Sequence, residues 1–332
     1  MNLETQYLGL KLKNPLMPGA SPLVDDLGMV RRLEDAGAAA IVMHSLFEEQ
    51  IELERAARER DVDSHTESFA EAITYLPTEE DFDESSEQYL QLIGKIKAAV
   101  SVPVIASLNG ITPGGWVGHA KLIEQVGADA LELNYYDLPS DPSKSGADVE
   151  KRALDLVTAI RKEVTIPIAV KLSPFFSSLP NFVSRLTQAG ANGVVLFNRF
   201  YQPDINIDDL DVDPVLELST PSELRLRLRW LAILSAKVDT YYAATGGIHN
   251  AEDAIRAIMA GAHSVQMVSA LLTNCPEHLG VVLANLTQWL EEHEYESLAQ
   301  MRGTMNLKHS PDATAFERAN YLRILKSWTP TL

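Results

Sequence analysis

A glycine pair in the last third of the chain is placed where it could bind an anion. Gly246-Gly247 follows an apolar run and precedes a helical pattern that begins at Ala251. A second apolar run then ends at Val268-Ser269. The backbone N–H groups of such turns point towards an anion, and glycine lets the backbone approach it closely. Because (β/α)8 barrels build phosphate sites from the loops after their last two strands, this pattern predicts a phosphorylated ligand.

The composition restricts the class of protein. The chain has 332 residues, of which 46% are hydrophobic, so it can bury one large core as a single barrel. A formal net charge of -18 argues against binding to nucleic acid or to anionic membranes, because phosphate-rich partners select Lys and Arg clusters. The single cysteine excludes intrachain disulfides and Cys-x-x-Cys metal motifs, and the histidines lack the spacing of metal ligands. We expect a cytoplasmic protein that binds small molecules and no metal.

Short apolar runs alternate with longer helical patterns, as buried parallel strands alternate with helices. The eight expected strands cover residues 16–18, 39–43, 102–107, 130–133, 166–171, 193–197, 240–244 and 264–267. The helices before strands two, four, six and eight each end in a glycine, which supplies a left-handed cap. These glycines are Gly37, Gly127, Gly190 and Gly261. The pattern predicts one (β/α)8 TIM barrel over residues 1–290, with a C-terminal helical extension, 291–332, packed on it.

Two stretches interrupt this alternation. Residues 46–88 follow the second expected strand, residues 199–222 follow the sixth, and both are rich in acidic side chains. Both leave the carboxyl ends of strands, which is the face where barrels place their active sites. They are therefore candidate lids or walls of a substrate site. A solvated acidic loop or an oligomer contact is the alternative.

Several motifs end successive strands in a fixed order. They are Asn14-Pro15 with Ala20-Ser21, then Asn134, Lys171 and Asn198, and finally the two expected phosphate loops. In this order they resemble the dihydroorotate dehydrogenase family, whose barrel binds FMN, and the resemblance covers most of the chain. It implies an FMN-dependent oxidoreductase of pyrimidine biosynthesis. Such an enzyme transfers hydride between a dihydropyrimidine-like substrate, dihydroorotate or a relative, and flavin N5.

The resemblance also implies roles for single residues. Ala20 and Ser21 would lie against the isoalloxazine ring, where small side chains permit close approach. Asn109, Asn134 and Asn198 would contact FMN or substrate, since an amide offers both donors and an acceptor. Each asparagine could instead cap a turn.

Two further strand ends carry residues that can hold charge. Lys171 follows an apolar strand, and its ammonium would stabilise the negative charge near N1 and C2=O of reduced flavin. His44-Ser45 ends the second strand where the family commonly has Lys-Ser, and imidazole changes charge near neutral pH. This difference predicts altered tuning of the flavin or a different ligand. The cofactor phosphate would be held by Gly246, Gly247, Val268 and Ser269.

The sequence departs from the family after Asn134. Dehydrogenases of the family continue into Asn-x-Ser-Cys-Pro-Asn or a serine variant, in which Cys or Ser takes a proton from the substrate carbon. Here the chain reads Asn134-Tyr135-Tyr136-Asp137. Asp137 occupies the position of the base by direct count, and a carboxylate in an apolar site can act as a general base. Tyr136 is the other candidate, and Asp137 could be a turn residue, so the substrate stays open.

A second departure lies before the helix that precedes strand seven. The family usually has a glycine-rich turn there, whereas this chain reads Leu218-Ser-Thr-Pro-Ser-Glu223 and then carries Arg225, Arg227 and Arg229. These arginines could reach a phosphate or a substrate carboxylate. The alternative is that they lie on a solvated or dimer-facing edge.

Two features that the chain lacks restrict the candidate electron acceptors. No Gly-x-Gly-x-x-Gly follows an expected strand, and the chain begins almost directly with the barrel, without the helical extension of the quinone-using branch. We expect a soluble electron acceptor or a partner subunit and, from the resemblance, a homodimer. Two other functions stay open: a lyase or isomerase for phosphorylated sugars on the same barrel, and a paralogue that binds flavin without turnover.

Overall fold

Eight parallel strands form a nearly closed barrel at the centre of the molecule. The computed structural model describes residues 1–51, 84–199, 201–213, 215–318 and 320–327. In chain order the barrel strands are β3 (Leu16–Pro18), β4 (Ile41–Phe47), β5 (Val104–Asn109), β6 (Ala130–Asn134), β7 (Ile168–Leu172), β8 (Gly193–Leu196), β11 (Tyr241–Thr245) and β12 (Ser264–Met267). The ladder runs β3-β12-β11-β8-β7-β6-β5-β4. At the seam between β3 and β4 the Ala39 N–H donates to the Leu16 carbonyl at 2.9 Å. The predicted (β/α)8 barrel is confirmed.

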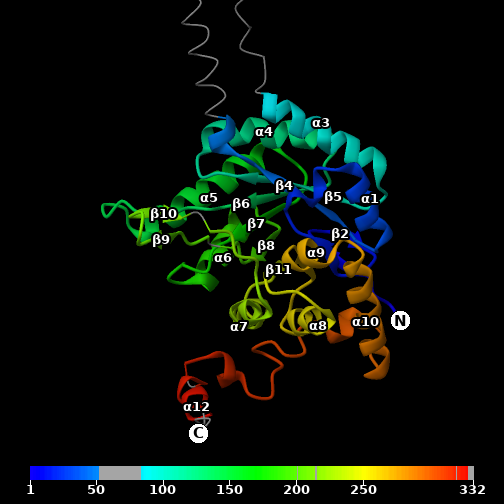
Figure 1. The fold of residues 1–332 in the computed structure, drawn as a ribbon. Helices are drawn as coiled ribbons and strands as arrows, with labels where there is room; N and C mark the ends of the chain where they lie inside the picture. The colour runs from blue at the N-terminus through cyan, green and yellow to red at the C-terminus, as the bar shows by residue number, and fades with distance from the viewer. Residues whose placement is uncertain (52–83, 200, 214, 319, 328–332) are drawn as a thin grey trace, which may run out of the picture.

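Helices surround the strands on the outside (Figure 1). They are α1 (Leu27–Asp35), α3 (Glu84–Ala99), α4 (Pro113–Gln125), α5 (Gly146–Glu163), α6 (Leu179–Ala189), α7 (Leu224–Ser235), α8 (Ala251–Met259) and α10 (His278–Glu292). The four predicted glycine caps are confirmed. Their φ angles are +103° at Gly37, +94° at Gly127, +112° at Gly190 and +120° at Gly261, a region that side chains with a Cβ rarely adopt.

A small hairpin covers the amino-terminal end of the barrel. Strands β1 (Thr5–Tyr7) and β2 (Leu10–Leu12) pair antiparallel, and Tyr7, Leu8 and Leu12 pack in one cluster with buried strand residues such as Val42. Thr5 fixes the hairpin by donating from its hydroxyl to the carbonyl of His263, at the start of β12. This plug leaves the opposite, carboxyl-terminal end of the barrel available for a site.

Both predicted interruptions of the barrel fall at the carboxyl ends of strands. Of the predicted stretch 46–88 after β4, residues 52–83 lie outside the described part of the chain, and residues 84–88 form the first part of α3. The stretch after β8 contains the antiparallel pair β9 (Asp204–Asn206) and β10 (Asp211–Asp213), then the short helix η3 (Pro221–Glu223). Apolar side chains stand out from this hairpin into solvent, with exposed fractions of 79% at Ile207 and 88% at Leu210.

The C-terminal segment returns along the outside of the barrel. Helix α10 continues through residue 290, which was the expected domain boundary, and α11 (Leu298–Met301) follows. Gly303 N–H donates to Ile258 of α8, and Leu307 N–H donates to Ala232 of α7. The last helix, α12 (Asn320–Lys326), stands apart from the barrel in Figure 1. Within the described residues, no helix is both long and apolar enough to cross a membrane.

Candidate functional site

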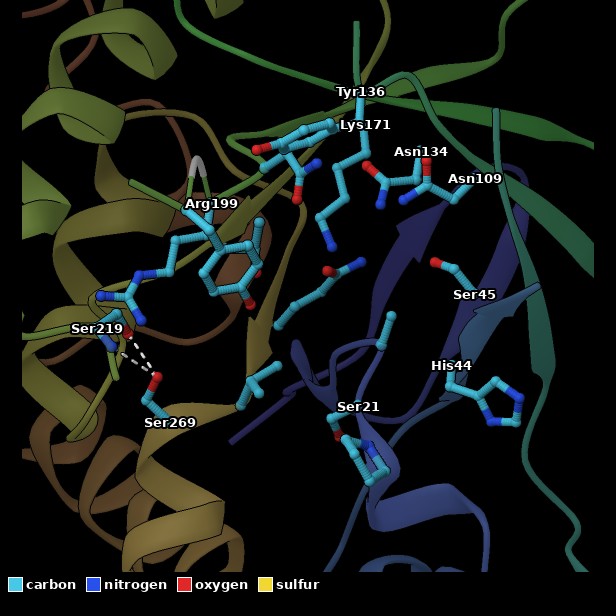
Figure 2. Close-up of a pocket in the computed structure, with 18 of the residues that line it drawn as sticks. Ser21, His44, Ser45, Asn109, Asn134, Tyr136, Lys171, Arg199, Ser219 and Ser269 are labelled. Atoms are coloured by element: carbon cyan, nitrogen blue, oxygen red, sulfur yellow. Dashed lines mark hydrogen bonds between the residues drawn. The ribbon is translucent and has the colours of Figure 1, made fainter. Parts of the chain in front are cut away.

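A cavity of about 950 Å³ opens at the carboxyl ends of the barrel strands, and every one of them contributes to its wall (Figure 2). All twelve residues predicted to bind the cofactor line it: Ala20, Ser21, His44, Ser45, Asn109, Asn134, Lys171, Asn198, Gly246, Gly247, Val268 and Ser269. They come from eight loops or strand ends that are far apart in the sequence. The volume lies at the upper end of the range for small-molecule sites, and this barrel face is where active sites are found.

Three polar atoms in the wall have no hydrogen-bond partner among the described residues. They are Asn134 Oδ1, Gln266 Oε1 and Ser21 Oγ, all shielded from solvent. A buried polar atom without a partner costs roughly 1–3 kcal/mol, so native proteins rarely leave three together. Amide oxygens accept hydrogen bonds, and a hydroxyl can donate or accept. The cavity is therefore suited to a ligand that carries N–H donors.

Lys171 is held over the cavity floor by a buried carboxylate. Its Nζ lies 3.4 Å from Glu132 Oε1, and the Glu132 side chain is 1% exposed. Glu132 Oε2 accepts a hydrogen bond from Gln266 Nε2 at 2.6 Å. Figure 2 shows the Lys171 amine pointing into the cavity, beside Asn134 and Asn109. The pair fixes the position of the ammonium group at this wall.

Sequence reasoning missed Glu132 and Gln266. Both lie inside otherwise apolar strands, at the centres of Ala130–Asn134 and Ser264–Met267. A single polar residue in such a strand was the available signal, because a buried polar side chain needs a partner. Its partner could not be inferred, since the two residues lie 134 positions apart.

The wall formed by β4 and β5 is tied together by hydroxyl groups and a histidine. Ser45 Oγ and Ser107 Oγ lie 2.7 Å apart, and the Tyr89 hydroxyl accepts the Ser107 N–H at 2.8 Å. His44 Nδ1 lies 2.6 Å from Asp25 Oδ1, and its ring contacts the edge of Tyr89 with centroids 5.1 Å apart. The histidine that replaces the family's lysine therefore pairs with an aspartate at the cavity wall.

The loops predicted to hold a phosphate meet at one point. Gly246 and Gly247 have φ angles of +82° and +80°, and the Gly247 N–H donates to Ser219 Oγ at 3.3 Å. Ser219 in turn donates to Ser269 Oγ from both its backbone N–H and its hydroxyl, each at 2.9 Å (dashed in Figure 2). Ser219, which sequence reasoning did not select, thus joins the loop before α7 to the loops after β11 and β12.

The two candidate bases point in different directions. Tyr136 lines the cavity, whereas Asp137 does not. The Asp137 carboxylate accepts from Arg152 Nη2 at 2.7 Å and from the Tyr135 hydroxyl at 3.0 Å, and it is 5% exposed. A position counted along the sequence after a strand end does not fix the direction of its side chain. The assignment of the base to Asp137 or Tyr136 stays a prediction, with Tyr136 at the cavity and the Asp137 carboxylate against Arg152.

The three arginines of α7 differ in burial. Arg225 and Arg229 are exposed, which matches the solvated edge. Arg227 is buried, and its Nε donates to the Thr245 carbonyl at 3.0 Å, immediately before Gly246. It lies behind the Gly246-Gly247 turn rather than in the cavity wall.

Fold and site together define an enzyme-type (β/α)8 barrel, with a cavity built from the ends of all its strands. Residues 79–290 match the model of the family described as Dihydroorotate dehydrogenase. The chain belongs to the dihydroorotate dehydrogenase family, and it is an oxidoreductase of that type. The family inferred from the order of its motifs is confirmed.

Curated relatives agree with this assignment. The chain is 25% identical over 310 residues to "Dihydroorotate dehydrogenase B (NAD(+)), catalytic subunit" of Methanothermobacter thermautotrophicus, covering 91% of this chain and 97% of the relative. It is 26% identical over 323 residues to the protein of that name from Shouchella clausii, with the same coverage. It is 29% identical over 232 residues to "Putative dihydroorotate dehydrogenase A (fumarate)" of Aeropyrum pernix, covering 67% and 72%.

Proposed function

We propose that this chain is an FMN-dependent oxidoreductase that acts on dihydroorotate or a related dihydropyrimidine. The observation that carries the proposal is the convergence of the twelve expected cofactor residues on one cavity, in a chain of this family. The relatives are named for dihydroorotate, which supports the substrate class. Family membership favours this chemistry over the lyase or isomerase alternative.

The residues at the cavity fit a flavin mononucleotide. Gly246, Gly247, Val268 and Ser269 would hold the phosphate, since they form the two loops after the last barrel strands. Ala20 and Ser21 would lie against the ring system. Asn134 Oδ1 and Gln266 Oε1 are acceptors without a partner, and a flavin or an imide-like substrate carries N–H groups that could supply one. Asn109 and Asn198 would complete the polar wall.

When bound, FMN supplies a hydride acceptor at N5. The Lys171 ammonium, fixed by Glu132, would stabilise negative charge that develops beside it, because a preorganised charge in a shielded site needs no reorganisation. Tyr136 is our candidate for the group that takes the proton from the substrate carbon, since it lines the cavity and Asp137 does not. His44, paired with Asp25, would set the charge of the facing wall.

Electrons would leave through a partner. The first relatives are called catalytic subunits, so we propose a separate electron-transfer subunit or another soluble acceptor. We also propose a homodimer, in which a second copy covers exposed apolar side chains such as Ile207 and Leu210 of the β9–β10 hairpin. Sedimentation velocity tests this, and a monomer throughout the micromolar range would contradict it. A single free cysteine supports a cytoplasmic location.

The visible spectrum of the purified protein, with and without added FMN, tests the cofactor. A colourless protein that takes up no FMN would contradict the proposal. Anaerobic mixing of the flavin-loaded protein with dihydroorotate or dihydrouracil then tests the substrate, because bound flavin bleaches on reduction. The second candidate, a flavin-binding paralogue without turnover, is favoured by the missing Cys or Ser after Asn134. Bleaching by any of these substrates would exclude it.

A further inference from the structure

Two arginines share one carboxylate at the phosphate end of the cavity. Arg199 Nη2 lies 3.6 Å from Glu223 Oε1, and Arg227 Nη1 lies 3.8 Å from Glu223 Oε2. Two guanidinium charges against one carboxylate leave a net positive charge.

Arg227 supports the glycine turn from behind. Its Nε donates to the Thr245 carbonyl at 3.0 Å and its Nη1 donates to the Glu223 carbonyl at 2.9 Å. A Cβ at Gly246 would lie 2.7 Å from Arg227 Nη2, so the turn rests directly on the guanidinium. Burial lowers the pKa of Arg227, and the nearby Arg199 charge lowers it further, while Glu223 opposes both effects. The two guanidinium groups therefore repel each other, and the Glu223 carboxylate that they share offsets part of this repulsion.

Arg199, unlike Arg227, faces the cavity itself. It lines the cavity, and Figure 2 shows its guanidinium directed to the side where Ser219 and Ser269 lie. Its guanidinium carbon also lies 5.9 Å from the centroid of the Tyr201 ring, within the range of a cation–π contact. Guanidinium groups bind phosphate oxygens by paired, charge-assisted hydrogen bonds.

We propose that Arg199 binds the phosphate group of the ligand directly and that Arg227 is a positioning residue, which holds the Gly246-Gly247 turn and adds positive charge behind it. Charge from these side chains then replaces the backbone donors of the glycine-rich turn that this chain lacks before α7. The site selects a phosphate monoester over the same molecule without phosphate. This inference rests on the proposed FMN function and identifies what determines the selectivity of that site.

The test compares the affinities of FMN and riboflavin, which differ only by the phosphate. Dissociation constants would be measured by quenching of flavin fluorescence for wild type and for R199Q, R199K, R227Q and R227K. In R199Q we expect the FMN affinity to fall about tenfold, the scale of one charge-assisted contact, while riboflavin binding stays within about twofold. R199K and R227K keep the charge and should recover part of the FMN preference. R225Q and R229Q, exposed positions on the same helix, serve as controls and should change neither constant.

The ratio of the two affinities decides the proposal. An FMN-to-riboflavin ratio in folded R199Q equal to that of wild type would overturn it, whatever happens in R227Q. Should R227Q fail to fold, R199Q and R199K still provide the answer, because Arg199 lies on the cavity wall and is partly exposed. A wild-type protein that binds neither flavin would instead contradict the proposed function.

Discussion

Lys171 and Glu132 form an ion pair in which both side chains are at least nine-tenths buried. Two buried charges stabilise each other as a pair, and removing one leaves the other buried without compensation. The pair therefore couples the stability of the barrel to the charge presented at the cavity. Replacing Lys171 should therefore change both the stability of the protein and the rate of flavin reduction, and a double variant separates these two effects.

We predict that K171M slows the reduction of bound flavin by about 10²-fold or more, the usual effect of removing one preorganised charge. The single variant should also lose about 3 kcal/mol of unfolding free energy, because Glu132 stays buried without its partner. The double variant K171M/E132Q should regain stability but remain slow. Stopped-flow absorbance and urea unfolding measure these quantities. A K171M protein that is reduced within twofold of wild type would refute the role of the ammonium.

We predict different effects on the rate of flavin reduction for substitutions at the adjacent residues Tyr136 and Asp137. Y136F should slow flavin reduction by about 10²-fold, the low end of general-base catalysis, because Tyr136 lines the cavity. D137N should change the rate by less than about threefold and reduce stability by about 1 kcal/mol, since it weakens a contact with the half-exposed Arg152. Rates come from single-turnover bleaching with dihydroorotate. If D137N proves slower than Y136F, our assignment of the base is wrong.

At the scale of elements, the turn after β11 is the least tolerant part of the site. Gly247 has φ +80°, and a Cβ there would lie 2.6 Å from the backbone nitrogen of Leu224, at the start of α7. G247A should therefore lose more than about 2 kcal/mol of unfolding free energy through strain and collision, and should bind FMN weakly. The control G118A, in the interior of α4 with no heavy atom within 4 Å of its Cβ, should gain about 0.5–1 kcal/mol. Equal stabilities of the two variants in urea unfolding would contradict this.

The elements that sequence reasoning found are those specified locally. Apolar runs and glycine caps such as Gly37 and Gly261 depend on neighbouring residues, so the barrel and the ends of its strands could be predicted. The β1–β2 hairpin was not predicted, because its short strands pair with each other and, unlike β3, stand outside the alternation of apolar strands and helices. Side-chain direction after a strand end, and pairs between distant strands such as Glu132 with Gln266, depend on tertiary packing and could not be read from spacing.

At the scale of the whole molecule, the end of the barrel opposite the cavity contains a titratable group. His263 lies near Tyr241, and its Nδ1 accepts the Tyr242 N–H at 3.1 Å. Burial lowers the pKa of His263 to about 3, and the charge of Arg302 contributes. In the unfolded chain a histidine takes up its proton near pH 6.5, whereas the folded protein does not. This difference destabilises the folded state as the pH falls from about 6.5 towards 3.

We predict that H263N flattens the fall of the melting temperature between pH 7 and pH 4, because asparagine can accept the same N–H without binding a proton. The exposed His293, changed to asparagine, is the control and should leave the slope as in wild type. Differential scanning calorimetry across this pH range measures both. A slope identical in H263N and wild type would show that His263 does not contribute.

Strands β3 and β4, at the two ends of the strand order, are joined more weakly than the other neighbouring strands of the barrel. Elsewhere each strand is joined to the next by a ladder, but here one amide, that of Ala39, reaches across to Leu16. Ala20 and Ser21 line the cavity on the β3 side of this seam, and His44 and Ser45 line it on the β4 side. Strands that share few backbone hydrogen bonds separate more easily than strands joined by a full ladder. Thermal breathing of the barrel would thus begin beside the very residues that surround its contents.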